Sequence, residues 1–434
     1  MPAATDGSTP LSSTRIRLAL IALAIGSFGI GTTEFVAMGL LPDIARDLLP
    51  ALFADSAEHA NAQAGWLISA YALGVVVGAP TIAAFVARYP RRYVLVILGA
   101  AFTVATVATS LAPTFETVLI SRFVAGIPHG AYFGIASLVA ARLMGPGRRA
   151  RGVALVMSGL TIANMIGVPL ATFVGQTFGW RSAYFLVAIV FALATAAVWF
   201  AVPQQPGDAG QTMRKELKAF TRAQVWFALL IGSIGFGGFF AVYSYIAPIV
   251  TDVTGESAGL VPWVLFAIGL GMTIGNFVGG HIADKSVKLS LFTFFPLMLV
   301  VLVGLALTAA WLPALFFFVF ATGFAAQGIG PTIQTRLMDV AGDSQSIAAA
   351  LNHSALNIGN ALGAFLGGVT IAAGAGYLSP VWVGAVLTVA GIALAVLSYA
   401  TESRSAAHRS AASHGSQPLG QNAERADAAA STRS

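Results

Sequence analysis

Long apolar stretches alternate with short polar ones along almost the whole chain. A helix that crosses a lipid bilayer needs about 20 mainly apolar residues, and the pattern predicts twelve such helices. The predicted spans cover residues 17–41, 63–87, 93–112, 117–140, 152–175, 181–202, 224–250, 260–282, 289–310, 313–335, 346–372 and 380–400. Because these spans leave no room for a folded soluble domain, the predicted fold class is an all-α membrane protein.

The composition agrees with lipid as the main solvent of the chain. Hydrophobic residues make up 57% of the sequence and charged residues only 9%, whereas soluble domains carry about 25% charged residues. The first apolar run is longer than the roughly 7–15 residues of a signal-peptide core, so we expect an uncleaved first helix. There is no cysteine, which excludes disulfides and thiolate metal sites.

The basic residues indicate the topology. All but three of the 23 Lys and Arg residues fall before the first span, in alternate connections, or in the tail. The exceptions are Arg46, Arg181 and Arg122, the last of which lies within a span. The positive-inside rule then predicts that both termini are cytoplasmic. Since the basic excess follows topology, we expect the lipid bilayer and no nucleic acid as a partner.

The two halves of the sequence repeat each other. Residues 25–42, IGSFGIGTTEFVAMGLLP, align with residues 231–248, IGSIGFGGFFAVYSYIAP, and paired glycines match in later spans. Parallel repeats of six helices are typical of transporters that rock around a central site. The predicted organisation is a disordered segment 1–14, a six-helix bundle 15–202, a cytoplasmic linker 203–223, a second bundle 224–400, and a disordered tail 401–434.

Three segments contain recognisable motifs: AAFVARYPRR (83–92), LISRFVAGIPHG (119–130) and SGLTIANMIGVPL (158–170). They resemble motifs of the major facilitator superfamily, in particular its twelve-helix drug:proton antiporter family. The segment TTEFVAMGLLPDIA resembles the branch of bacterial sugar, purine-nucleoside and chloramphenicol efflux permeases. The resemblance covers residues 15–400 and implies proton-coupled efflux by alternating access in a bacterial cytoplasmic (inner) membrane.

The resemblance also assigns gating residues to two symmetry-related loops. The first loop keeps the family's basic residues but has Ala83, Ala87 and Pro90 where the family has Gly, Asp and Gly. The second loop, GHIADK, keeps an acidic and a basic residue. The implied gating residues are Arg88, Arg91, Arg92, Asp284 and Lys285. In the fifth span, the resemblance singles out Gly159, Gly167 and Pro169, although Val168 separates the Gly–Pro pair of the family motif.

Glu34 is an acid inside an apolar span. A lone carboxylate at the bilayer centre costs about 2.5–3.5 kcal/mol. Glu34 lies about 12 Å below Pro42 and Arg122 about 9 Å from Glu116, at the rise of an α-helix; both enter from the same side, so the two charges can pair. Burial favours the neutral acid and the guanidinium favours the carboxylate, so a solute that separates the pair would favour proton uptake. The alternative is a permanent structural salt bridge.

Other polar side chains are candidates for the wall of a central cavity. His129 shares a helix face with Arg122 and either assists proton movement or packs as a hydrogen-bonded histidine. A polar stripe in the eleventh span, with its repeat-related partner in the fifth, either holds helices together or forms a wall for a polar uncharged solute. One of two tyrosines in the seventh span is expected to point inward. The cavity candidates are Thr33, His129, Tyr132, Asn164, Tyr243, Tyr245, His353, Asn357 and Asn360.

The sequence contains no P-loop, no His/Asp/Glu cluster with metal-ligand spacing and no Ser-His-Asp arrangement. We therefore expect no ATP dependence, no metal, no cofactor and no enzyme activity. The predicted function is proton-coupled export of a small drug-like, sugar or nucleoside-type solute by a monomer, with Glu34 and Arg122 coupling the proton. The alternatives are a proton-independent facilitator and a proton-symport uptake carrier of the same fold.

Overall fold

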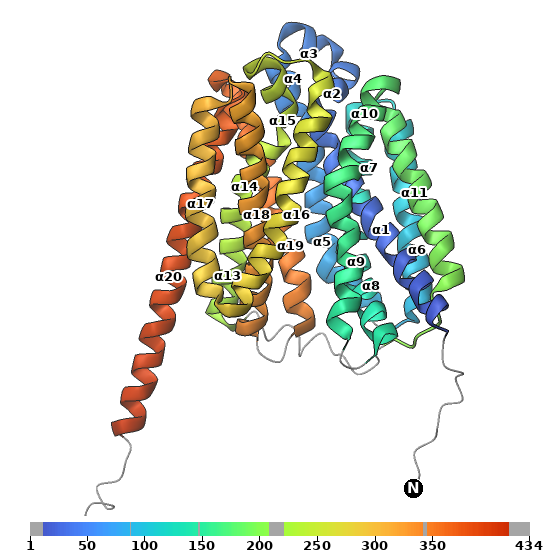
Figure 1. Cartoon of the computed structure of the whole chain (residues 1–434). Helices are drawn as coiled ribbons and strands as arrows, with labels where there is room; N and C mark the ends of the chain where they lie inside the picture. Colours follow the sequence, from blue (N-terminus) through green and yellow to red (C-terminus); the bar gives the residue numbers. More distant parts are fainter. Residues whose placement is uncertain (1–11, 87, 146–147, 208–220, 342–344, 416–434) are drawn as a thin grey trace, which may run out of the picture.

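The computed structural model describes residues 12–86, 88–145, 148–207, 221–341 and 345–415. Over these residues the regular structure is helical, without strands. Twelve segments are long and apolar enough to cross a membrane, which confirms the predicted number of spans. The spans stand side by side in one bundle (Figure 1).

The N-terminal half contains the first six spans, several of which are broken into shorter helices. At one end of the bundle, three short helices (α2 to α4) follow the first span, where the hydrophobic pattern predicts only a connection (Figure 1). The elements are α1 (Ser13–Gly39), α2 (Leu41–Leu48), α3 (Pro50–Asp55), α4 (Ala57–Ala64), α5 (Trp66–Val86), α6 (Arg91–Leu111), α7 (Phe115–Gly126), α8 (His129–Met144), α9 (Arg149–Ile162), η1 (Ala163–Gly167), α10 (Val168–Phe178) and α11 (Trp180–Ala201).

The C-terminal half contains the other six spans. Its first span is interrupted by a π-helical turn, η3, inside the segment that aligns with α1. The elements are α13 (Ala223–Leu230), η3 (Ile231–Gly235), α14 (Phe236–Ser244), α15 (Ile246–Pro248), η4 (Ile249–Val253), η5 (Ala258–Leu260), α16 (Val261–Lys285), α17 (Val287–Thr308), α18 (Leu312–Ala341), α19 (Gln345–Thr370), η6 (Ile371–Ala375) and α20 (Ser379–Gly415).

The helix of the last span continues well beyond its predicted end. The chain is predicted to be disordered from residue 401, but α20 continues as a helix to Gly415. Its last part is rich in alanine, the residue with the highest helix propensity, which outweighs the lack of apolar side chains to bury. The remaining tail from residue 416, residues 1–11 and most of the predicted linker (208–220) lie outside the described residues.

The repeat is visible in the way matched glycines let helices approach. A Cβ on Gly74 of α5 would collide with the carbonyl oxygen of Phe123 on α7. A Cβ on Gly271 of α16 would collide in the same way with the carbonyl of Phe320 on α18. Small residues that allow such close contact are a common means of packing membrane helices, so the two halves use the same device at matching places.

The two halves are joined more tightly at one end of the bundle than at the other. We call the end at which α1 begins the basic end, because the connection there between α5 and α6 carries Arg88 and α6 begins with Arg91 and Arg92, and we call the end with α2 to α4 the far end (Figure 1). At the far end, apolar residues of both halves form one continuous core. Toward the basic end, the N-terminal half has a core of its own, made of side chains such as Leu23, Phe102 and Phe191. The interface between the halves is therefore closed at the far end.

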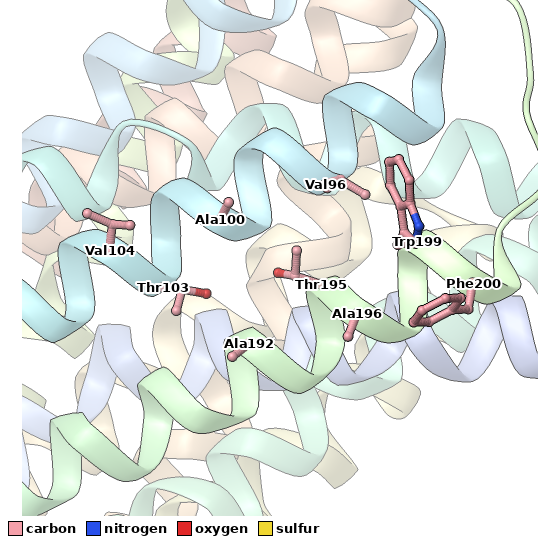
Figure 2. Close-up of a pocket in the computed structure, with 9 residues that line it drawn as sticks. All are labelled: Val96, Ala100, Thr103, Val104, Ala192, Thr195, Ala196, Trp199 and Phe200. Atoms are coloured by element: carbon pink, nitrogen blue, oxygen red, sulfur yellow. The ribbon is translucent and has the colours of Figure 1, made fainter.

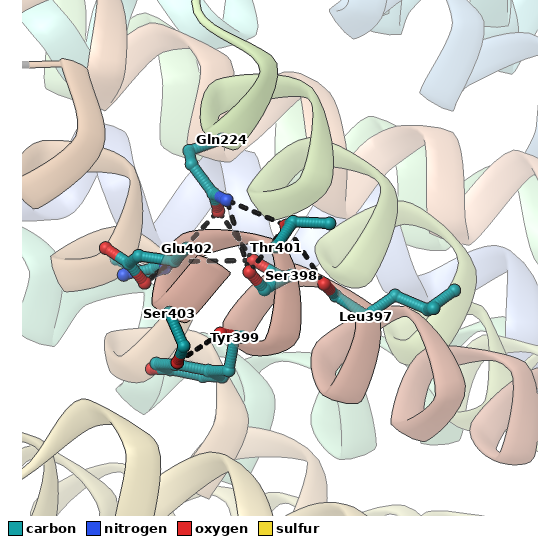
Figure 3. A network of polar contacts seen from close by, with 8 residues as sticks. Gln224, Leu397, Ser398, Tyr399, Thr401, Glu402 and Ser403 are labelled. Atoms are coloured by element: carbon teal, nitrogen blue, oxygen red, sulfur yellow. Dashed lines mark hydrogen bonds and ion pairs between the residues drawn. The ribbon is translucent and has the colours of Figure 1, made fainter. Parts of the chain in front are cut away.

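A polar network fixes three helices of the C-terminal half at the basic end (Figure 3). Arg336 of α18, which is 6% exposed, donates to Glu402 of α20 at 2.8 Å and to Gln224 of α13 at 3.1 Å. Ser398 also donates to Gln224, at 2.7 Å. Because this arginine is buried and paired, its role extends beyond the topology signal for which it was counted.

Candidate functional site

Glu34 lies on α1 at the interface between the two halves. Its side chain is almost fully buried, with the residue 4% exposed. Asn360, on α19 of the other half, donates its amide to the Glu34 carboxyl at 3.5 Å. His129, on α8 of the same half, has its Nδ1 atom 3.9 Å from the second carboxyl oxygen. The carboxyl group thus contacts both halves of the molecule.

Arg122 contacts α1, but not through the carboxyl group of Glu34. Its guanidinium donates to the main-chain carbonyls of Thr33 at 2.8 Å and Glu34 at 3.4 Å. The rings of Tyr71 and Tyr184 lie 4.3 and 5.5 Å from the guanidinium carbon. These cation–π contacts hold the arginine on the side of α1 that faces its own half. The Glu34 carboxyl points toward the C-terminal half. The expected direct ion pair is replaced by bonds to the helix backbone.

His129 connects Glu34 to further aromatic side chains. The helix of this span breaks at Pro128, which has no N–H to donate, and His129 begins the next helix, α8. The hydroxyl of Tyr71 lies 3.2 Å from Nδ1 of His129. The ring of His353, on the other half, is 6.0 Å from that of His129 and stacks on Phe133 at 5.1 Å.

Tyr71 and Phe133 therefore lie beside His129 and His353, although neither residue was predicted from the sequence. Both lie in apolar spans where an aromatic residue is ordinary, so the sequence offers only a weak signal. For Phe133 it is the position four residues after His129, on the same helix face. Tyr71 has no comparable pattern around it.

Several polar atoms near this interface are buried without a partner among the described residues. They are Oδ1 of Asn357, Oδ1 of Asn360 and the hydroxyl of Tyr243. Asn357 donates its side-chain N–H to the carbonyl of His353, four residues earlier in the same helix, at 3.0 Å. The oxygen of this amide has no partner among the described residues. Tyr243 packs against Phe35 of the other half, with ring centroids 5.6 Å apart. Buried polar groups almost always find partners, so these three atoms are exceptions among the described residues.

Other predicted cavity residues do not bond to the carboxyl group of Glu34. Tyr132 donates to the carbonyl of Leu23 at 3.3 Å and packs on Phe102, inside the core of the N-terminal half. Tyr245 donates to the carbonyl of Ala364 at 2.7 Å, closer to the far end. Thr33 lies against Arg122.

Asn164 lies in η1, and its amide donates to the carbonyl of Leu160 in its own helix at 3.1 Å, while Oδ1 has no partner among the described residues. Its main chain packs closely on Gly269 of α16 in the other half. Asn164 therefore belongs to a different part of the interface from Asn360, its repeat-related partner.

The fifth span owes its shape to the residues of the motif that it carries. Pro169 follows the π-helical turn η1, as expected because the proline ring clashes with the carbonyl one turn earlier. A Cβ on Gly159 would collide with the carbonyl of Ala24, and one on Gly167 with Thr32. Both contacts are with α1, so the two glycines let α9 and η1 lie against the helix that carries Glu34.

The residues assigned to gating loops lie at the basic end. Arg88 stacks on the ring of Tyr89 at 5.1 Å, and Arg92 on that of Trp199 at 5.2 Å, both within the N-terminal half. The main-chain N–H of Arg91 donates to Gln205 at 3.0 Å. Asp284 and Lys285 are exposed at the end of α16, and Ala87 lies outside the described residues.

Hydrogen bonds close the interface at the far end. Asn61 of α4 donates to the hydroxyl of Tyr377 at 2.7 Å. Gln176 at the end of α10 donates to the carbonyl of Ala258 at 2.9 Å, and Ser69 of α5 donates to that of Ala361 at 3.1 Å. Each bond joins the N-terminal half to the C-terminal half, so the far end must break these contacts to open.

A separate hollow of about 470 Å³ lies on the outside of the N-terminal half, between α6 and α11 (Figure 2). Its sides are small residues such as Ala100, Ala192 and Ala196, and Trp199 and Phe200 stand at one end. The hollow contains neither Glu34 nor any other charged residue. Within the described part of the chain, no three His, Asp or Glu side chains are close enough to share a metal ion.

Known proteins resemble the chain over most of its length. It is 39% identical to the inner membrane transport protein YdhP of Escherichia coli K12, over 88% of the chain and 95% of that protein. It is 31% identical to a chloramphenicol resistance protein of Streptomyces lividans, over 87% of the chain and 95% of that protein. The solved structure of a D-xylose–proton symporter matches with a TM-score of 0.69 and 16% identity, over 87% of the chain and 97% of the symporter.

The model of one protein family also matches the chain. This family is described as the Major Facilitator Superfamily, and its model matches residues 23–311 and 243–429. This match covers both halves, as do the two relatives above that share 39% and 31% identity. The chain therefore belongs to the major facilitator superfamily.

Proposed function

We propose that this chain is a proton-coupled antiporter that exports a small drug-like, sugar or nucleoside-type solute by alternating access. Its family makes it a membrane transporter of a small molecule, and its relatives and twelve apolar helices make it a multi-pass inner membrane protein. The observation that carries the proposal is the position of the Glu34 carboxyl, which contacts Asn360 in one half and approaches His129 in the other.

A carboxyl group at this position would feel the rocking of the two halves. When the halves separate around it, Glu34 loses the Asn360 amide that hydrogen-bonds to it and gains water. Hydrogen bonds and water both stabilise the charged form of a carboxyl group, whereas burial favours the neutral form. Each change of conformation, or a solute that displaces Asn360, would therefore alter the proton affinity of Glu34.

His129 would pass the proton onward. Its Nδ1 atom lies 3.9 Å from the carboxyl and 3.2 Å from the Tyr71 hydroxyl. If the neutral imidazole carries its proton on Nε2, the single lone pair of Nδ1 can accept from either the Tyr71 hydroxyl or a protonated Glu34. Glu34 would therefore pass its proton to Nδ1 once Tyr71 has turned away and the carboxyl has moved closer. Arg122 is bound to the backbone of α1 next to Glu34. Its positive charge would stabilise the ionised carboxylate of Glu34 although that group is buried.

The unpartnered amide oxygens of Asn357 and Asn360 and the hydroxyl of Tyr243 would bind the solute. Amides and hydroxyls suit polar uncharged groups, and the neighbouring ring of Phe35 offers a flat apolar surface. A compound with hydroxyl or amide groups on a compact, partly apolar body fits this combination. Chloramphenicol is the first compound to test, because a relative is named a chloramphenicol resistance protein.

The distribution of basic residues would place the basic end in the cytoplasm. The halves are joined by hydrogen bonds at the far end, so this conformation would be the one that loads solute from the cytoplasm. One charge that crosses 100 mV supplies about 2.3 kcal/mol, which corresponds to roughly 50-fold accumulation at about 1.4 kcal/mol per decade. A single carboxyl is thus sufficient, and we propose that one chain works alone.

Everted membrane vesicles test the proposal. Respiration acidifies their lumen, and chloramphenicol, nucleosides and sugars are then added outside. Antiport predicts that a transported compound makes the lumen more alkaline and that Glu34→Gln abolishes this response. Glu116→Gln, which changes an exposed acid at the start of α7, should respond like the parent.

Other responses would point to a different transport mode. Luminal acidification would identify a symporter, and transport without a pH change would identify a facilitator. The coupling role of Glu34 would be refuted if Glu34→Gln still moved solute uphill at every pH.

A further inference from the structure

A second hollow lies in the interface between the halves, at the far end and on the side where α10 and α16 run next to each other (Figure 1). Its volume is about 700 Å³, and it has one wall from each half. Leu170 and Phe173 of α10 and Trp263 of α16 line it and are each more than half exposed, at 52%, 56% and 64%. Since these spans face lipid, the hollow opens sideways to the membrane.

The hollow is polar at one end only. Asp43, Gln176 and Ala258 line the part of the hollow nearest the far end of the bundle. From there to Met165 its walls are apolar. Along α10 and η1, Gln176 to Met165 corresponds to about 17 Å at the helical rise. This arrangement matches the way an amphiphile lies in one leaflet, with its head group near the aqueous boundary and its body along the helices.

Asp43 provides a negative charge for that head group. It lies in the first turn of α2 and is half-buried in the wall of the hollow. Burial raises the pKa of its carboxyl, and the charge of Arg46 offsets this only in part. The Arg46 guanidinium instead stacks on Phe53 at 5.0 Å, and no described basic side chain forms an ion pair with Asp43.

Asp47, one turn further along α2, shows the contrast. It pairs with Arg181 and accepts a hydrogen bond from the indole of Trp180 at 3.0 Å. Burial alone would raise its pKa, but these bonds from Arg181 and Trp180 outweigh burial and lower it. Of the two acids on this short helix, only Asp43 has a charge left to offer a ligand.

We propose that this hollow binds an amphiphile with a single positive charge, whose ammonium group meets Asp43 and whose apolar body lies between α10 and α16. A phosphate head group would place a second negative charge beside Asp43, so an anionic amphiphile fits less well. The site is separate from Glu34 and does not depend on the proton coupling proposed above. Because its walls belong to different halves, an occupant would favour the conformation described here, with the far end closed.

Quenching of Trp263 tests this binding. The protein is placed in nanodiscs of zwitterionic lipid, at a pH well above that at which carboxyl groups ionise, and titrated with a spin-labelled quaternary ammonium that carries a hexadecyl chain. An uncharged spin-labelled amphiphile of the same length serves as the reference probe. Trp263→Phe shows how much of the quenching comes from this residue among the seven tryptophans of the chain.

We expect Asp43→Asn to weaken binding of the cationic probe about tenfold and to leave the neutral probe unchanged. Asp47→Asn and Glu34→Gln should bind both probes like the parent. Leu170→Phe, which narrows the hollow without adding a tryptophan, should weaken both probes and so tests the site even if Asp43→Asn does not fold.

Three results would overturn the proposal. The first is equal binding of the cation by Asp43→Asn and the parent, and the second is quenching by the cationic probe that is as strong in Trp263→Phe as in the parent. The third is loss of cation binding in Glu34→Gln, which would place the ligand in the central site instead.

Discussion

α1 and α14 occupy matching places in the two halves, but their middle turns carry opposite chemistry. In the aligned repeat, Thr33 and Glu34 of α1 correspond to Phe239 and Phe240 of α14. By the match of Gly126 with Gly323, Arg122 corresponds to Val319 of α18. One half therefore places an acid and an arginine where the other places two aromatic rings and an aliphatic side chain.

The difference shows that two halves with the same backbone arrangement can carry different side-chain chemistry at matching positions. Phe240 packs against Phe236 and Phe239, at 5.4 and 5.2 Å between ring centroids, and stacks on Phe35 of the other half at 6.2 Å. This aromatic wall stands opposite the polar face of α1, and the C-terminal half adds its polar groups from α19 instead. The backbone symmetry is kept, while at these matched positions the acid and the arginine occur only in the N-terminal half.

The largest effect is expected when the acid is moved to the matching place in the other half. Glu34→Gln combined with Phe240→Glu should give no uphill transport and a lower Tm than the parent. Near residue 240 the described side chains offer rings and no cation, so the carboxyl would bear a cost of about 2.5–3.5 kcal/mol. Transport assays and thermal unfolding measure both effects. Restored transport would mean that depth alone matters and that the two places are equivalent.

Arg122→Lys should reduce transport by about tenfold or more. A lysine cannot donate to two carbonyls as a fork or stack flat between Tyr71 and Tyr184, so α1 would lose its fixed position behind Glu34. Rates of solute efflux give the size of the loss. Arg46→Lys is the matched control, because that guanidinium also stacks on a ring but lies exposed at the far end. Equal rates in the two variants would contradict the role of Arg122.

Asn360→Leu should weaken transport by roughly threefold, because a hydrogen bond between membrane helices contributes about 0.6 kcal/mol on average. Asn164→Leu changes the repeat-related residue, whose amide bonds only to its own helix, and should have a smaller effect. Efflux rates at matched expression compare the two. The reverse order would locate the functional amide in the fifth span.

The smallest effects separate two tyrosines that lie two residues apart. Tyr245→Phe removes a hydrogen bond to Ala364 and should lower the free energy of unfolding by about 0.5–1.5 kcal/mol. Tyr243→Phe removes a hydroxyl without a described partner and should leave stability nearly unchanged while it weakens solute binding. Thermal unfolding with and without solute distinguishes them, and equal destabilisation would contradict the assignment.

The number of spans and the family could be predicted because both depend on long-range features of the sequence. A run of about twenty mainly apolar residues predicts a membrane-spanning helix. The motifs around Arg122 and Gly159 are recognised from residue types at fixed spacings. The orientation of single side chains could not be predicted in the same way. Ile25 is 37% exposed and Ile30 is fully buried, yet both are apolar because lipid and protein interior are similar solvents. Hydrophobic periodicity is correspondingly weak.

The same reason explains what was missed in the candidate site. The sequence placed Glu34 and Arg122 at similar depth, and the structure brings them together. It did not indicate that Tyr71 and Tyr184 would hold the guanidinium against the backbone, since that depends on the rotation of three helices. The short helices α2 to α4 were missed because they are too short to have a periodic signal, although they carry Asp43 and Asn61, which contribute to the interface at the far end.

The continuation of α20 beyond the bundle has a practical consequence for imaging. From Ser403 to Gly415 the helix extends about 18 Å at the rise of an α-helix, and the ion pair between Arg336 and Glu402 anchors its base. A rigid soluble domain fused in helical phase to this rod would inherit the orientation of the twelfth span. A transporter of 44.6 kDa that offers little mass outside the detergent would then carry a marker for particle alignment in electron cryo-microscopy.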